Sequence, residues 1–291
     1  MELLVTLRKL EALEYVLPYA DGIITGRNFT TAYHLSLDEI EQAVSFCKKF
    51  NKKSFIVMDD FVSEDEKMQM YDYLDFIDGL DVDGIFFHDL GVYSAAKSYG
   101  LVSKLIYDGK SVMCNSLDSA FLLDKGIDSV MISRELTLDE VKEILANHPG
   151  RIDMQVFGHL RMSYSGRHFL KNYFREIGKD YDYLGKETLS LVEEQRDYKM
   201  PIVEDEDGTY IYTDYIFEMF DELPELRESL RYGVVDTLFI EDLALVCQIL
   251  RDYRRINASN SLFIRNSFLH NHPGNFTSGY FYQKTNLTKD E

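Results

Sequence analysis

Cysteine, tryptophan and long hydrophobic runs are scarce or absent in this chain. Its three cysteines, Cys47, Cys114 and Cys247, are scattered and form no Cys-x-x-Cys pair, which argues against a disulfide framework. No run approaches the roughly 20 apolar residues needed to span a bilayer. The residues after Met1 lack the basic and apolar regions of a signal peptide. We therefore expect a cytoplasmic protein with reduced thiols and no membrane contact.

Positive charge is also scarce. The chain has 31 Lys and Arg against 50 Asp and Glu, a formal net charge of −19. This balance argues against a broad basic surface for nucleic acid, because such binding depends on phosphate neutralisation, and against adhesion to anionic membranes. A local basic site remains open, since Arg161, Arg167, Lys171 and Arg175 lie close together in the sequence.

The common catalytic signatures are missing as well. The sequence has no His-Glu-x-x-His zinc motif, no Gly-x-Ser-x-Gly elbow, no Walker loop and no Gly-x-Gly-x-x-Gly. His270 and His272 have the spacing of a weak metal motif, but no third ligand is identifiable. We therefore predict no metal site.

Short apolar runs alternate with segments of helical period along the 291 residues. We predict strands at Leu3–Leu7, Gly22–Thr25, Ser54–Met58, Gly84–His88, Lys104–Tyr107, Ser129–Ser133, Asp153–Phe157 and Asp236–Glu241. Helices are predicted from Ser36 to Phe50 and from Thr137 to Ala146, each opened by a capping box, and from Ser116 to Asp124. Eight strand–helix repeats predict an α/β fold, a TIM-like (β/α)8 barrel. A doubly wound open sheet is the alternative.

One interval is too long for a simple crossover. We therefore predict a barrel over residues 1–255 with an insertion at 159–232 between strands 7 and 8. The insertion includes a helix at His168–Ile177 and a hairpin around Asp207-Gly208. Residues 256–291 are predicted to form a C-terminal arm, either with a short strand around Ser278–Tyr282 or partly disordered.

The most informative stretch is Gly158-His-Leu-Arg-Met-Ser-Tyr-Ser-Gly-Arg-His168, which follows the seventh predicted strand. We expect it to be a loop, and polar loops at strand ends concentrate binding groups. Parallel strands of a barrel also bring their C-terminal ends to one face. The catalytic candidates at these ends are Asp59, His88, Glu135 and Glu241. The substrate-binding candidates are Asn115, Arg134, Arg161, Tyr164, Ser165, Arg167 and His168. For each carboxylate, helix capping or a salt bridge is the competing interpretation.

Several ordered segments resemble peptidase family U32, the collagenase-like peptidases. Gly158, Leu160, Tyr164, Ser165 and Gly166 fit the family's Gly-x-Leu-Cys-x-x-Tyr-Ser-Gly-x-Cys signature. Further matches are Gly22–Gly26, Ser54–Asp59, Asn115-Ser116, Ser133–Glu140, Glu204–Tyr210, Leu223–Leu226, Phe239–Glu241 and Asn275–Phe281. The resemblance implies a TIM-like barrel.

The family's label is peptidase, but relatives support hydroxylation of tRNA uridine, ribosomal RNA cytidine or a ubiquinone precursor, in some cases as paired unlike subunits. Those members hold an iron–sulfur cluster with four cysteines. Here Arg161 and His168 occupy two of these positions, and the other two fall near Gln195 and Glu218. Thiolate ligation needs the missing sulfurs, so we predict no cofactor.

Three functions remain open on this basis. The first is a cluster-less subunit that supports tRNA uridine hydroxylation together with a cysteine-bearing relative, with tRNA bound through the complex. The second is a hydrolase, as the family label says, that uses the carboxylates at the strand ends or His88. The third is an anionic small-molecule binding protein, in which Arg134, Arg161 and Arg167 hold a carboxylate or phosphate.

Overall fold

The computed structural model describes residues 1–27, 35–58, 62–192, 194 and 198–283. Eight parallel strands form a closed barrel, in which neighbours in the chain are neighbours in space. The ring closes because the last barrel strand pairs with both the first and the seventh, for example Val5 with Val235 and Gln155 with Val234. The barrel strands are β1 (Glu2–Thr6), β2 (Gly22–Thr25), β3 (Lys53–Met58), β4 (Gly84–Phe87), β5 (Leu105–Asp108), β6 (Ser129–Met131), the first half of β7 (Ile152–Ser165) and β11 (Leu230–Val235). The predicted (β/α)8 barrel is confirmed.

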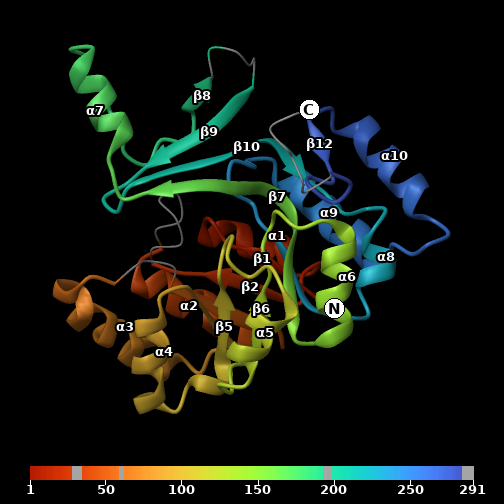
Figure 1. Ribbon diagram of the computed structural model, residues 1–291, viewed down its shortest axis with the longest axis horizontal. Coiled ribbons are helices and arrows are strands. Elements are labelled where there is room, and N and C mark those ends of the chain that lie inside the picture. The colour runs from red at the N-terminus through yellow and green to blue at the C-terminus, as the bar shows by residue number, and fades with distance from the viewer. Residues whose placement is uncertain (28–34, 59–61, 193, 195–197, 284–291) are drawn as a thin grey trace.

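Helices cover the outside of the barrel (Figure 1). They are α1 (Leu13–Val16), α2 (Leu37–Lys49), α3 (Lys67–Leu80), α4 (Leu90–Ala96), α5 (Ser116–Leu123), α6 (Leu138–Asn147) and α9 (Leu243–Arg255), with short 3-10 turns at Leu10–Ala12, Glu64–Glu66, Lys97–Tyr99 and Val102–Lys104. Both predicted capping boxes are present. Ser36 and Glu39 exchange hydrogen bonds at the start of α2, and Thr137 and Glu140 do so at the start of α6. No helix in the described ranges is long and apolar enough to cross a membrane.

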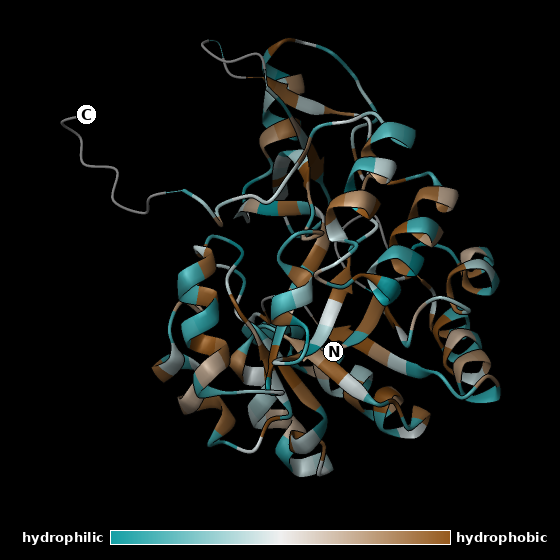
Figure 2. Cartoon of the chain, turned by 90° about the vertical axis from the view of Figure 1, so that its right-hand side faces the viewer, coloured by the Kyte–Doolittle hydropathy of each residue, from teal (hydrophilic) through white to brown (hydrophobic). Residues whose placement is uncertain are grey.

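Two apolar layers hold the barrel. The strands alternate, so that Leu4 packs inside the ring while Leu3 and Val5 pack against the helices. The inner cluster consists of Leu4, Ile24, Phe55, Val57, Phe86, Ile106, Met131, Tyr232 and Val234. Figure 2 shows hydrophobic residues along the barrel strands and hydrophilic ones on the outer surfaces of the helices. The inside of the ring is therefore a packed core, and the site must lie at its mouth.

The prediction of the eighth strand at Asp236–Glu241 is wrong. The strand is Leu230–Val235, and the residues after it form a turn in which the Ile240 N–H bonds the Thr237 carbonyl and Phe239 has a φ of 62°. Arg231 and Gly233 interrupt the apolar run of the true strand. Gly233 is closely packed, since a Cβ there would lie 2.7 Å from the Met1 sulfur and 3.1 Å from a Val156 methyl carbon. This register places Asp236 directly after the strand, at the mouth of the barrel.

The prediction of a loop at Gly158–His168 is also wrong. Strand β7 continues to Ser165 and pairs antiparallel with β10 (Thr209–Phe217), which in turn pairs with β9 (Lys199–Glu204), and β9 pairs with β8 (Ser190–Val192). We call the paired outer part of β7 and β10 the ribbon. The predicted hairpin is confirmed: Asp205 accepts the backbone N–H groups of Asp207 and Gly208 between β9 and β10. The predicted helix is confirmed as α7 (Phe169–Glu176).

The chain after β10 returns to the barrel through α8 (Leu223–Leu226). The described residues after α9, up to residue 283, form a helix and a short strand. Residues Ser261–Asn271 form α10, which packs Ile264 and Phe268 into the outer core. The short strand β12 lies at Phe276–Thr277, slightly before the predicted position, and pairs with β10. The missed helix has little amphipathic signal, because it also exposes Leu262 and Phe263.

Gly158 marks the point where β7 leaves the barrel. Its φ is 119°, and an added Cβ would lie 2.4 Å from the Asp236 carbonyl oxygen. We expect Gly158→Ala to destabilise the fold by about 3 kcal/mol or more, because strain and a backbone clash coincide. Gly150→Ala is the matched control: its φ is 72° but nothing lies within 4 Å of its added Cβ, so it costs about 1–2 kcal/mol. Urea unfolding of both variants measures the difference, and equal losses would contradict this account of the exit from the barrel.

Candidate functional site at the barrel mouth

A polar cavity lies at the C-terminal ends of the barrel strands, beneath the ribbon. Its volume is about 60 Å³, room for a few water molecules or one small anionic group. Its polar lining residues are Thr6, Asp108, Lys110, Arg134, Gln155 and Asp236 from the barrel, and Arg161 and Tyr212 from the ribbon. We call it the mouth cavity. Active sites of (β/α)8 barrels lie at this face.

One wall of the mouth cavity is an ion cluster around Asp108. The carboxylate lies 2.7 Å from Lys110 Nζ and 3.2 Å from an Arg134 guanidinium nitrogen, and Arg134 Nε donates to Gln155 Oε1 at 2.9 Å. Burial of Asp108 opposes its ionisation, but the charges of Arg134 and Lys110 outweigh this and hold the pKa of the carboxyl well below its usual range. Asp108 is therefore ionised at neutral pH, and it orients two cations toward the cavity.

The opposite wall carries a carboxyl with the reverse shift. Asp236 Oδ1 accepts hydrogen bonds from Thr6 Oγ1 at 3.3 Å and from the Leu238 N–H at 3.0 Å. Burial raises the pKa of Asp236, and these hydrogen bonds and the Arg134 charge offset the effect only in part. Two carboxyls whose environments move their pKa values apart can divide acid and base roles. The mouth cavity therefore combines cationic side chains with a titratable acid.

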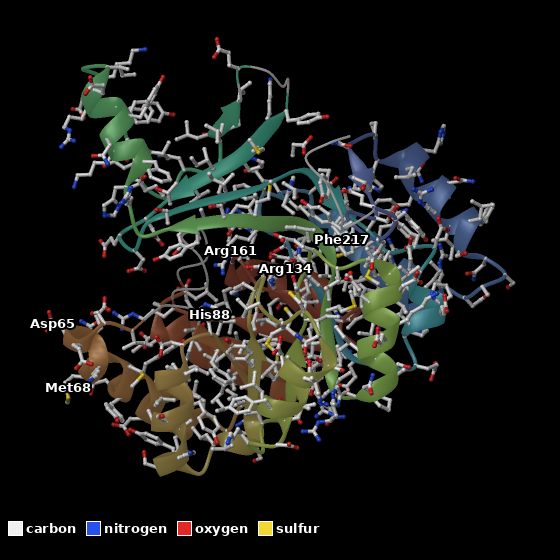
Figure 3. The ribbon with its side chains drawn as sticks, in the orientation of Figure 1. Asp65, Met68, His88, Arg134, Arg161 and Phe217 are labelled. Atoms are coloured by element: carbon white, nitrogen blue, oxygen red, sulfur yellow. The ribbon has the colours of Figure 1, made fainter. Side chains whose placement is uncertain are left out.

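The ribbon closes the cavity from above. Arg161 on β7 is paired across the ribbon with Tyr212 on β10, and its guanidinium lies 5.8 Å from the ring centre of Tyr210. Figure 3 shows Arg161 on the ribbon and Arg134 on the barrel below it, close to each other. Two predicted binding residues, 27 positions apart in the sequence, thus line one cavity.

The four catalytic candidates do not gather in this cavity. His88 lies near it, with Nδ1 2.9 Å from the Asp108 carbonyl oxygen, but it is not a lining residue. Glu135 and Glu241 are exposed. Asp59 lies outside the described residues. The binding candidate Asn115 caps α5, where its side-chain oxygen accepts the Leu117 and Asp118 N–H groups at 3.0 Å.

The remaining binding candidates build the far end of the ribbon. The Tyr164 hydroxyl donates to the Asp207 carbonyl at 3.0 Å, the Ser165 hydroxyl accepts the Arg167 N–H at 3.2 Å, and His168 Nδ1 lies 3.7 Å from Glu204. Ser165 is four strand residues beyond Arg161, about 13 Å at the usual rise per residue. The signature segment is therefore divided, with Arg161 at the mouth and the other four candidates beyond it.

Sequence reasoning missed several lining residues, namely Thr6, Lys110, Gln155, Tyr212 and Asp236. The sequence pattern could have identified some of these residues. Inward positions alternate along each strand, so Leu4 predicts an inward Thr6, and Val234 predicts an inward Asp236 once the eighth strand is placed correctly. Nothing in the sequence indicated that Tyr212 on the hairpin folds back over the mouth.

The residues present do not fit the iron–sulfur cluster that the resemblance implies. The three thiols lie on separate elements: Cys47 is buried behind the barrel in α2, Cys114 Sγ donates to Ser111 O, and Cys247 Sγ donates to Tyr15 O. At the aligned positions, Arg161 is a cation and Glu218 is held 2.9 Å from Arg265 Nε, while residue 195 is outside the described ranges. Within those ranges no three His, Cys, Asp or Glu side chains are placed to hold a metal ion.

Comparison with known proteins decides the family. The sequence pattern of peptidase family U32 matches residues 24–286. The chain belongs to this family. A solved member, the U32 peptidase Mk0906, superimposes with a TM-score of 0.51 at 14% identity, covering 81% of this chain and 92% of that one; this likeness bears on the fold alone.

Relatives within the U32 family carry names of two kinds. The chain is 30% identical to tRNA hydroxylation protein P2 of Bacillus subtilis (strain 168) over 68% of this chain and 65% of that protein. It is 22% identical to tRNA hydroxylation protein P1 of the same organism, over 88% and 62%. It is also 29% identical to an uncharacterized protease of Methanocaldococcus jannaschii, over 84% and 61%. The chain spans roughly three fifths to two thirds of the length of these relatives.

The ion cluster predicts how stability depends on pH. Removing one partner of a buried ion pair leaves the other charges without compensation. Asp108→Asn should therefore lower the free energy of unfolding by about 3 kcal/mol at pH 7. Because folding lowers the pKa of Asp108 below its ordinary 3.8, its contribution is complete above that value and is lost as the pH falls through the folded pKa. The deficit of the variant should therefore shrink below about pH 4. Urea unfolding at pH 7 and in steps from about pH 4 down to about pH 2.5 measures this progressive decrease. Asp81→Asn, which removes an exposed partner of Lys48 and Lys104, should change little, and a pH-independent deficit at Asp108 would refute the assignment.

Proposed function

We propose that this U32 protein is a cluster-less cytoplasmic subunit that supports tRNA uridine hydroxylation together with a cysteine-bearing relative of the same family. The observation that carries the proposal is Arg161, which stands where the family signature has a cluster cysteine and lines the mouth cavity instead. A cationic side chain there replaces metal ligation with anion recognition. The similarity to both P1 and P2, two tRNA hydroxylation proteins of one organism, supports pairing with a second U32 chain.

A subunit of this kind should co-purify with its partner. Purified without oxygen from its own host by a mild affinity tag, the chain should bring down a cysteine-rich U32 relative, with iron bound only to that partner. Iron analysis and mass spectrometry of the separated subunits check this. A lone, iron-free protein, or iron that stays with this chain, would count against the pair.

A second candidate function is supported by the mouth cavity itself. Arg134, Lys110 and Arg161 offer cations to a space large enough for one carboxylate or phosphate group. This anion-binding role fits the tRNA proposal, in which the group belongs to a small co-substrate, and it also stands alone. Peptide hydrolysis, the activity in the family's label, remains an alternative hypothesis. His88 and the exposed Glu135 and Glu241 form no arrangement in the described structure that favours it, and metal-dependent or inhibitor-sensitive peptide cleavage by the purified chain would support it.

Arg161 allows the anion-binding role to be tested. Inorganic phosphate and small dicarboxylates should raise the melting temperature, since a ligand that binds only the folded state stabilises it. Arg161→Ala should weaken binding about tenfold or more, because charge-assisted hydrogen bonds contribute about 1.5–3 kcal/mol. Arg251→Ala is the matched control for charge, since Arg251 is exposed on α9, away from the mouth cavity and the ribbon. Titration calorimetry of both variants separates a mouth site from general charge, and equal losses would argue against the mouth site.

A further inference from the structure

Helix α7 and its flanks carry a cationic surface on an acidic protein. Arg167, Lys171, Arg175 and Lys179 recur every four residues, and Glu176 is the only acidic residue between 167 and 179. All four cationic side chains are exposed. None of them makes an ion pair with another residue that the structure describes. We call these four residues the α7 basic face. The net charge of the whole chain is −19, so this concentration of positive charge is not a consequence of composition.

The helix is fixed in place although it buries none of its residues. The fully buried Glu204 accepts the Leu170 N–H at 2.7 Å and the Lys171 N–H at 3.1 Å at the start of α7. At its other end Phe174 stacks on Tyr181 with ring centres 4.8 Å apart. An isolated helix of eight residues is not stable in water, so these contacts with the insertion hold α7. The exposed side chains are thus presented on a positioned support.

The α7 basic face stands away from the acidic body. The ribbon runs from Gly158 to Ser165, which is about 20 Å of strand, and Figure 1 shows α7 beyond its outer end, clear of the barrel. Charges are screened over about 8 Å at physiological ionic strength. A polyanion at α7 therefore experiences the four cations, together with the neighbouring Glu176, Asp180 and Asp182, more strongly than the negative charge of the barrel.

We propose that the α7 basic face binds the sugar–phosphate backbone of an RNA. That this RNA is the tRNA substrate rests on the proposed function. Guanidinium and ammonium groups repeated at one-turn spacing match a row of phosphates, which supply most of the sequence-independent affinity for nucleic acid. The ribbon connects this surface to Arg161 at the mouth cavity, so an RNA held at α7 has a direct path along β7 to the candidate site.

The decisive experiment compares two triple variants of equal charge change. One is Arg167→Ala, Lys171→Ala, Arg175→Ala. The control is Lys49→Ala, Lys97→Ala, Lys125→Ala, which removes three exposed cations at the end of α2, in the 3-10 turn after α4 and in the turn after α5. Binding of labelled total tRNA is followed by fluorescence anisotropy between about 50 and 200 mM salt, with the chain as purified from its host and any subunit that accompanies it.

The α7 variant should bind tRNA at least about tenfold more weakly at the low-salt end, and its salt slope should fall by about 2 to 3, close to one for each phosphate that is no longer neutralised. The control variant should keep both its tRNA affinity and its salt slope. Equal weakening of the two variants, or unchanged affinity of the α7 variant, overturns the proposal. So does an α7 variant that keeps its tRNA affinity but loses its accompanying subunit, since α7 would then dock a protein. The proposed function is tested by a separate experiment, which measures tRNA hydroxylation in cells that lack the chain. That result does not depend on which surface of the chain binds the RNA, so the two proposals can fail independently.

Discussion

Strand β7 holds the barrel and its cover together. Its first half pairs parallel with β6 and β11 and thereby helps to close the ring, and its second half pairs antiparallel with β10 outside the ring. Gly158 allows this change of direction at the point where the Asp236 backbone is too close for any side chain. Because the two halves are one strand, the positions of Arg161 and α7 are set by the geometry of the barrel. The ribbon is therefore a continuation of a barrel strand.

The mouth cavity joins two electrostatic environments within this frame. Asp108 is stabilised as an anion by Arg134 and Lys110, while burial favours the protonated form of Asp236. The cationic cluster around Asp108 and the protonatable Asp236 therefore line the same cavity, together with Arg161 from the ribbon. This combination suits a small acidic molecule that needs proton transfer, and it requires no metal ligand from this chain. Under the proposed function, a position at which the family signature has a cysteine carries an arginine that still lines the cavity.

Much of the fold could be predicted from the sequence, because its evidence is local. The strand–helix alternation, both capping boxes and the Asp207-Gly208 hairpin depend on residues that are neighbours in the chain. The prediction of the eighth strand failed because Arg231 and Gly233 break its apolar pattern, while the uninterrupted apolar run Leu238-Phe239-Ile240 that follows lies in a turn. The prediction of a loop at the signature segment failed because a polar stretch with glycines resembles a loop until its partner strand β10 is known. The candidate site was found only in part for the same reason: Arg134 and Arg161 have recognisable chemistry, whereas Asp236 and Tyr212 become important only through pairing over long distances.

The central claim is that this chain, without a cluster of its own, is needed for hydroxylation of tRNA. The most direct test is to delete its gene in the host and quantify hydroxylated uridine in purified tRNA by mass spectrometry, with complementation by the intact chain and by Arg161→Ala. The account predicts loss of the modification on deletion, recovery with the intact chain and little recovery with the variant. Unchanged hydroxylation in the deletion strain would contradict it.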